Sequence, residues 1–299
     1  MSGIDDHIGV VIDLDELDET SEGFNPDLIH NVDSLDVLLP VAVHQLLSRQ
    51  EMLKSQDALD AVRKEAKGLE SKGTWDNSTV REASAVQQEA RRKGIKVHFG
   101  SLMSICSIKF AELAKHLQIY KGRLVYRGDC AKDEWGAAAI YQEVSASPTS
   151  ITTTNYTIAY GLLPGNDIST VDAVKAYVQA HLKSEHATWI SLPQELWPEE
   201  WIEKGYKRPV VRLIKALYGH PESGPMWDKK LHACMKKAGF QHLEGSPGFF
   251  YHKSLGVECT VYVDDFVLVC PPHLEAKVWK TLSDMIDFKD PPEPITRYL

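Results

Sequence analysis

The stretch VYVDDFVLV, Val261 to Val269, constrains the fold more than any other part of the chain. Its flanks are apolar at consecutive positions, which predicts strand structure covered on both faces, yet Asp264 and Asp265 place two adjacent carboxylates in the middle. A hairpin turn through Asp264-Asp265 would be unusual, because two-residue turns favour Asn-Gly or Asp-Gly. Carboxylates on a covered hairpin repel each other and lose water, a penalty that a bound cation removes. The alternative is a solvent-exposed acidic turn at the end of a sheet.

Hard divalent ions such as Mg²⁺ prefer carboxylate oxygen and keep open positions for phosphate, so an aspartate pair on a hairpin suits phosphoryl transfer. Asp172, which ends a short β-branched run before the helix-like stretch AVKAYVQAHL, is a candidate third carboxylate. Taken by itself, Asp172 would be a helix N-cap. With the pair elsewhere in the chain it becomes a metal-ligand candidate, because two metal ions are best held by ligands from different strands.

The composition is that of a globular protein with an acidic N-terminal segment. The chain has 299 residues, of which 43% are hydrophobic and 25% are charged, enough for one large or two ordinary domains. The net charge is −9, but residues 1–40 contain eleven Asp and Glu residues and no Lys or Arg. We therefore predict an acidic, disordered leader over residues 1–45, with a partner-binding segment as the alternative.

Cysteine usage and hydropathy limit the cellular setting. The five cysteines are widely spaced and form no C-x-x-C pair, so neither a disulfide framework nor a zinc site is expected. The N-terminus lacks the basic-then-apolar pattern of a signal peptide, and no run approaches the roughly 20 apolar residues that a membrane span needs. We expect an intracellular protein, cytoplasmic or nuclear, without a membrane segment.

The periodicity of apolar residues predicts an α+β fold, because helices and strands mix without a regular βαβ alternation. Helices are expected over Glu51–Ser71, Val80–Lys93, Trp227–Ala238 and Leu274–Ile286, and strands over Gly122–Gly128, Phe249–His252 and Val257–Val269.

Several of these segments resemble one known family. VYVDDFVLV resembles the Tyr-x-Asp-Asp hairpin of reverse transcriptases, and RLIKALYGHPESGPMWDKKL is similar to the LKKALYGLKQAPRAWYEKL segment of copia-type retrotransposon polymerases. KGRLVYRGD resembles their KARLVARG, SKGTW their NGTW, and VDAVKAYVQAHL their LDVKTAFLNGDL. The five blocks occur in the family's order and cover roughly Glu51 to Leu299, which is far more specific than any one of them.

The resemblance implies the palm and fingers of a right-hand polymerase, truncated before the thumb. Residues 46–168 would form a fingers-like region, and residues 169–299 the palm, with a fingers insertion near residues 183–218. The substrates would be an RNA or DNA template with its primer, and deoxynucleoside triphosphates.

The resemblance also implies roles for particular residues. Asp172 and Asp264 would bind two Mg²⁺ ions, which activate the primer 3′-hydroxyl and neutralise the leaving pyrophosphate, and Asp265 would be the adjacent, weaker ligand. Lys121 and Arg123 would hold the triphosphate, although they could be ordinary exposed basic residues. Tyr177 would exclude a ribose 2′-hydroxyl or be a core aromatic, and Tyr262 would support the primer end or simply pack.

Departures from the family pattern keep a second function open. Residues 221–225, Pro-Glu-Ser-Gly-Pro, replace the family's Gln-Ala-Pro stretch, and the sequence ends where relatives continue into a primer-gripping segment, a thumb and an RNase H domain. The leading hypothesis is an RNA-directed DNA polymerase domain. The alternative is a truncated, inactive protein that only binds nucleic acid or a partner. A nucleotidyl cyclase or small-RNA polymerase would share the hairpin but not the ALYG and KGRLV segments. The sequence makes no prediction of the oligomeric state.

Overall fold

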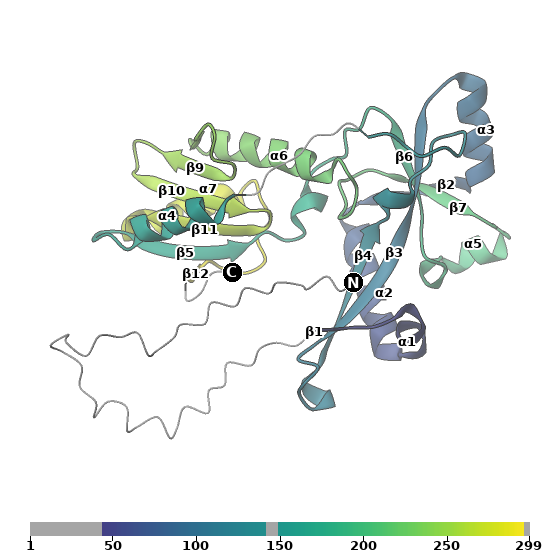
Figure 1. Ribbon diagram of the computed structural model, residues 1–299, viewed down its shortest axis with the longest axis horizontal. Helices are drawn as coiled ribbons and strands as arrows, with labels where there is room; N and C mark the ends of the chain where they lie inside the picture. Colours follow the sequence, from purple (N-terminus) through teal and green to yellow (C-terminus); the bar gives the residue numbers. More distant parts are fainter. Residues whose placement is uncertain (1–43, 142–148, 296–299) are drawn as a thin grey trace, which may run out of the picture. The chain divides into compact units, whose positions relative to one another are not determined.

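The structure is a computed structural model, and it describes residues 44–141 and 149–295 (Figure 1). The predicted acidic leader falls outside the described residues except for its last two positions, which belong to the short strand β1, His44–Leu46. The described chain contains two six-stranded sheets.

The first sheet has the strand order β1-β3-β6-β7-β2, and β4 pairs with β3 beside this path. Strands β3 and β4 form a long antiparallel ribbon, whose register runs from Leu102 opposite Tyr126 to Lys109 opposite Ile119. Strand β6 instead runs parallel to β3. The bounds are β2 Trp75–Glu82, β3 Val97–Lys109, β4 Ile119–Tyr126, β6 Ala187–Ser191 and β7 Pro209–Leu213.

The helix that packs against β4 is α2, Gln56–Ser71, and it buries an apolar stripe at a spacing of three to four residues: Ala58, Val62, Ala66 and Leu69. The single helix expected over Glu51–Ser71 is in fact two, because Ser55 ends α1, Arg49–Lys54, and caps α2 by accepting a hydrogen bond from the Ala58 amide. The other helical segments of this half are α3 Ala83–Lys93 and α5 Glu199–Glu203, with the 3₁₀ turns η4 Lys115–Leu117, η5 Gly128–Cys130 and η7 Gln194–Leu196.

The second sheet has the order β12-β5-β11-β10-β9-β8. Its strands are β5 Asp167–Asp172, β8 Gln241–His242, β9 Phe249–His252, β10 Val257–Tyr262, β11 Asp265–Cys270 and β12 Glu293–Pro294. The helices of this half are α4 Ile151–Gly161, α6 Ser223–Lys237 and α7 Pro272–Ser283, with the 3₁₀ turn η6 Ala176–Gln179. The two central strands β11 and β10 come from the stretch VYVDDFVLV and the residues around it.

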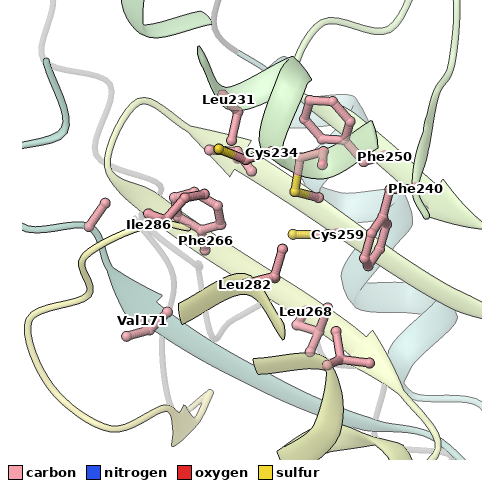
Figure 2. Packing of buried hydrophobic residues seen from close by; sticks show 14 of the residues in the cluster. Val171, Leu231, Cys234, Phe240, Phe250, Cys259, Phe266, Leu268, Leu282 and Ile286 are labelled. Carbon is pink, nitrogen blue, oxygen red and sulfur yellow. The ribbon is translucent and has the colours of Figure 1, made fainter. Parts of the chain in front are cut away.

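The core of the second half lies between one face of this sheet and the helices α6 and α7. Figure 2 shows side chains from both helices and from strands β5, β9, β10 and β11 meeting there: Val171, Leu231, Cys234, Phe250, Cys259, Phe266, Leu268 and Leu282, with Phe240 and Ile286 from loops. The other face is covered by α4, whose Gly161 lies against Ile168 and Val269 with no room for a Cβ. Both faces of β11 are therefore covered, as its continuous apolar sequence predicts.

Several elements differ from the sequence-based expectation. Strands β3, β6 and β7 and helix α4 were not expected, and the stretch after Asp172 forms only the short turn η6. Helix α3 begins at Ala83 rather than Val80 because residues 80–82 belong to β2. In the described part of the chain, no helix is long and apolar enough to span a bilayer.

Candidate active site

The turn between β10 and β11 lies one residue earlier than the sequence suggested. Tyr262 pairs with Asp265 across the hairpin, so the two-residue turn is Val263-Asp264 rather than Asp264-Asp265. Val263 has a φ of 57°, a left-handed conformation that β-branched residues rarely adopt and that costs on the order of 1–3 kcal/mol. The positive φ that a two-residue hairpin requires is thus supplied by a strained valine in place of glycine.

Two hydrogen bonds from distant segments hold this strained turn. The Trp227 indole on α6 donates to the carbonyl oxygen of Val263 at 2.8 Å. The amide of Ala173, directly after β5, donates to the carbonyl oxygen of Asp264 at 2.7 Å. The turn is therefore fixed both to the helical layer and to the neighbouring strand, which explains how the unfavourable backbone conformation persists.

The same strand pairing brings the third aspartate to the turn. In the antiparallel register of β5 with β11, Asp172 lies directly opposite Asp265. Because side chains alternate along a strand, Asp172 and Asp265 project to the same face of the sheet, the face opposite the core residue Phe266. The structure thus places Asp172, Asp264 and Asp265 together at one end of the second sheet.

Burial and neighbouring negative charge raise the pKa of two of these carboxylates, Asp265 and Asp264. Burial raises the pKa of Asp265 to about 6, with further contributions from the charge of Asp264 and from the hydrogen bond and charge of Asp172. The pKa of Asp264, whose side chain is exposed, is also raised, first by the protein packed around its carboxylate and then by the charge of Asp172, while Arg123 and Lys121 oppose this rise. Among residues 44–141 and 149–295, no lysine or arginine forms an ion pair with any of the three.

The carboxylates do not converge on one point. Within the described residues, no three His, Cys, Asp or Glu side chains are arranged as a metal-binding group. The donor chemistry nevertheless suits Mg²⁺: all three side chains offer carboxylate oxygen, they lie at one strand end, and their mutual repulsion is not balanced by an ion pair. A divalent cation bound here would offset the negative charge that contributes to the raised pKa of Asp265.

A cavity of about 260 Å³ adjoins Asp264. Lys121 and Arg123 line it from β4, and Tyr177 lines it from η6. The remaining lining residues are Glu65, Leu69, Gly122, Leu124, Val125, Lys175, Ala176, Val178, Leu217, Tyr218 and Val263. One carboxylate of the turn and all three residues expected to bind a nucleotide therefore share one concave site.

The cations of this cavity are held close to each other. Burial lowers the pKa of Lys121, and the neighbouring charges of Lys109 and Arg123 lower it further. On the same strand Leu124 and Tyr126 are buried, whereas the alternating residues Lys121 and Arg123 are exposed and line the cavity. Two positive side chains opposite a carboxylate form a site suited to an anionic ligand bound together with a metal ion.

Tyr177 lines the same cavity. It is half-buried, and its ring centroid lies 5.8 Å from that of Tyr218. Burial raises the pKa of Tyr177, and the nearby Tyr218 and Asp264 add to the rise. Tyr262 is 43% exposed, so it does not pack in the core.

Glu65, Lys175 and Tyr218 line the cavity, although no role was predicted for any of them. Tyr218 belongs to the ALYG segment, and that motif was the one signal that could have pointed to it. Lys175 stands where the family has threonine, and nothing distinguishes Glu65 from other polar residues of its helix.

Comparison with known proteins identifies the class. Residues 107–294, more than half of the chain, match the family described as reverse transcriptase (RNA-dependent DNA polymerase), and the chain belongs to that family. The resemblance to copia-type enzymes and the α+β, right-hand polymerase fold expected from the sequence are thereby confirmed.

One solved structure also shows a likeness. The chain is similar to a telomerase from Candida albicans, whose structure is that of a complex with a fragment of telomeric RNA. The identity is 10%, the TM-score is 0.41, and the match covers 80% of this chain and 46% of the telomerase chain. The chain thus spans less than half the length of that telomerase.

Proposed function

We propose that this chain is the RNA-directed DNA polymerase domain of a copia-like retrotransposon and that it transfers nucleotides onto a primer 3′-hydroxyl by a two-metal mechanism. One observation carries the proposal: the register of β5 with β11 places Asp172 opposite Asp265, beside a cavity that joins Asp264 to Lys121, Arg123 and Tyr177. The substrates are an RNA or DNA template with its primer, and deoxynucleoside triphosphates.

Each group has a part in this reaction. Asp172 and Asp264 would hold the two Mg²⁺ ions, and Asp265 would be the weaker neighbouring ligand. The bound metal supplies Lewis acidity for the primer hydroxyl and charge neutralisation for the leaving pyrophosphate. Lys121 and Arg123 bind the triphosphate oxygens through charge-assisted hydrogen bonds. The Tyr177 ring occupies the space beside the sugar and excludes a 2′-hydroxyl.

The proposed division into fingers and palm follows the two sheets. Strands β2, β3 and β4 belong to the predicted fingers region 46–168, and β6 and β7, from the insertion near 183–218, complete the same sheet. The second sheet lies within 167–294 and carries the three aspartates. Helix α4 packs on β10 and β11, so we assign it to the palm as well.

The test is primer extension on poly(rA)/oligo(dT) with Mg²⁺. We expect the wild-type chain to extend the primer and Asp264→Asn to lose on the order of a thousandfold in rate, because one ligand oxygen charge at the reacting centre is removed. The control is Asp284→Asn, an exposed aspartate at the end of α7 that lies outside the cavity. Equal background synthesis from wild type and Asp264→Asn would refute the polymerase and leave a protein that only binds nucleic acid or a partner.

A further inference from the structure

An ion pair between two residues that line the cavity joins elements that are far apart in the sequence. The ammonium of Lys175 binds the carboxylate of Glu65 on α2, and both side chains are 25% exposed. Both residues line the cavity with Lys121, Arg123 and Tyr177. The pair therefore connects α2 to the segment that leads from Asp172 to Tyr177.

The backbone of Lys175 is held in a conformation that it would not adopt freely. Its φ is 49°, in the left-handed region where lysine is uncommon. Lys175 is the N-cap of η6, three residues after the end of β5, and the Val178 amide donates to its carbonyl oxygen at 2.9 Å. The direction in which Tyr177 points thus depends on a strained residue two positions earlier.

Helix α2 is in close contact with both the Lys175 side chain and strand β4. A Cβ added to Gly68 would lie 3.7 Å from Cε of Lys175, so the lysine stem runs over the helix at that glycine. A Cβ added to Gly122 would lie 2.5 Å from the carbonyl oxygen of Ala61, so β4 rests directly on the helix backbone. One helix therefore supports both the strand that carries Lys121 and Arg123 and the turn that carries Tyr177.

A second ion pair from α2 reaches the same turn. Lys72, at the C-terminal end of α2, binds Asp287 at 3.0 Å. The carbonyl oxygen of Asp287 accepts from the Val174 amide at 2.8 Å, and its amide donates to the Gln179 side chain at 2.9 Å. This pair is more exposed, at 27% and 68%, so it contributes less than the pair inside the cavity.

We propose that Glu65 and Lys175 are positioning residues of the nucleotide pocket: their ion pair holds the turn 173–179, and with it Tyr177, against α2 and so sets the width of the site and its preference for deoxynucleotides. The inference rests on the proposed polymerase function. Since α2 precedes the matched residues 107–294, it assigns a role in the site to a helix outside the family match.

A competing role for the same lysine makes opposite predictions. If Lys175 were a triphosphate ligand that Glu65 merely restrains, Glu65→Gln would free the lysine and lower the KM for dTTP. Lys175→Met would remove the ligand and raise that KM. If the pair positions the turn, both substitutions raise the KM for dTTP and both weaken discrimination against the ribonucleotide. The sign of the Glu65→Gln effect therefore separates the two roles.

The experiment compares Glu65→Gln, Lys175→Met and the exchanged pair Glu65→Lys/Lys175→Glu. We expect each single substitution to raise the KM for dTTP and to lower the dTTP/UTP preference by about tenfold, which corresponds to about 1.4 kcal/mol. The exchanged pair should restore most of the KM for dTTP and most of the dTTP/UTP preference. Lys72→Met should change both quantities less than the two single substitutions do. Arg81→Met, which breaks the Arg81–Glu89 pair outside the cavity, is the matched control and should behave as wild type.

A second measurement does not depend on activity. Hydrogen exchange at the Val178 and Ala180 amides, which bond to the carbonyls of Lys175 and Tyr177, should be about tenfold faster in both single variants and recover in the exchanged pair. Unchanged exchange at these amides, or a lowered KM in Glu65→Gln, would overturn the proposal. A wild-type chain that extends no primer would refute the polymerase function, and hydrogen exchange would still decide whether the pair holds the turn.

Discussion

The aspartate turn and the aromatic cluster around His220 both contain titratable side chains with shifted pKa values, but their surroundings differ. In the cluster, His220 is 4% exposed, its Nδ1 accepts from the Glu222 amide at 3.2 Å, and its Nε2 lies 3.3 Å from the hydroxyl of Thr188. The rings of Tyr126 and Tyr141 pack within 4.8 and 5.1 Å of it. At the turn, Asp172, Asp264 and Asp265 crowd one another without an ion pair among the described residues.

The difference indicates which region acts on a ligand. Burial lowers the pKa of His220 to about 3, so this side chain is neutral at pH 7 and its hydrogen bonds are satisfied by the protein. The aspartates are crowded in their charged form, a state that costs stability and that a bound cation would relieve. A satisfied neutral cluster indicates structure, whereas uncompensated like charge indicates a binding site.

The largest stability effect is expected from the acid titration of His220. The folded chain takes up this proton only near pH 3, whereas the unfolded chain takes it up near pH 6.5. The unfolded state thus binds more protons between these values, and the free energy of unfolding falls as the pH drops, by up to about 1.4 kcal/mol per pH unit. Urea unfolding between pH 4.5 and 7.5 should show a shallower pH dependence in His220→Leu than in wild type.

Two other effects of the His220→Leu substitution must be separated from the titration of His220. His98 also has a lowered pKa, chiefly from burial and then from the charge of His186, so some acid dependence should persist in His220→Leu. The substitution leaves the Thr188 hydroxyl and the Glu222 amide without this partner, which lowers stability at every pH. The slope is therefore the quantity to compare, and identical slopes would show that His220 does not carry the effect.

Asp265 should show the opposite pH dependence. Its folded-state pKa is raised to about 6 from the ordinary value of 3.8, so the folded state binds more protons in this window. The free energy of unfolding therefore decreases as the pH rises from about 3.8 to about 6, and this free energy stays lower above pH 6. We expect Asp265→Asn to raise that free energy at pH 8 by about 1–2 kcal/mol, allowing for solvent screening, and to leave it unchanged near pH 3.5.

Adding Mg²⁺ to the same unfolding measurement tests whether the carboxylates bind the ion. If the carboxylates bind Mg²⁺, the ion should stabilise wild type at pH 8 and stabilise Asp265→Asn less, because binding to the folded state adds to its stability. Asp284→Asn serves as the control and should respond to Mg²⁺ as wild type does. A lower free energy of unfolding for Asp265→Asn at pH 8 would mean that the wild-type carboxylate is not destabilised by its neighbours.

The same contrast separates what the sequence could predict from what it could not. The apolar flanks of Asp264 and Asp265 predicted a covered hairpin, and Val267, Leu268, Val269 and Cys270 are indeed fully buried. Helix α6 buries Trp227, Leu231, Cys234 and Met235 at the spacing that the sequence showed. These features depend on periodicity, which is local to each segment.

The remainder depends on contacts between distant residues. The turn lies at Val263-Asp264 because Trp227 and Ala173 hold its carbonyls, and no local signal favours positive φ at a valine. The residues alone made Asp172 a candidate third carboxylate with a helix N-cap as the alternative, and the resemblance then implied its role as a metal ligand. The Glu65–Lys175 pair joins residues 110 positions apart, and neither local sequence contains a signal that predicts this pairing.

A further prediction tests the link between the turn and its core. In Trp227→Phe, an aromatic ring still fills the buried site, but the hydrogen bond from the indole to the Val263 carbonyl is lost. We expect the free energy of unfolding to fall by about 1–2 kcal/mol from that bond and the smaller ring together. The strained turn should also loosen, so primer extension should slow more than it does in Tyr126→Phe, which removes the 2.7 Å bond to Tyr141 in the first sheet. Because both variants lose one hydrogen bond of a buried aromatic side chain, an equal loss of activity would mean that turn rigidity is irrelevant to the reaction. A loss confined to Trp227→Phe would locate the required rigidity at the aspartates themselves.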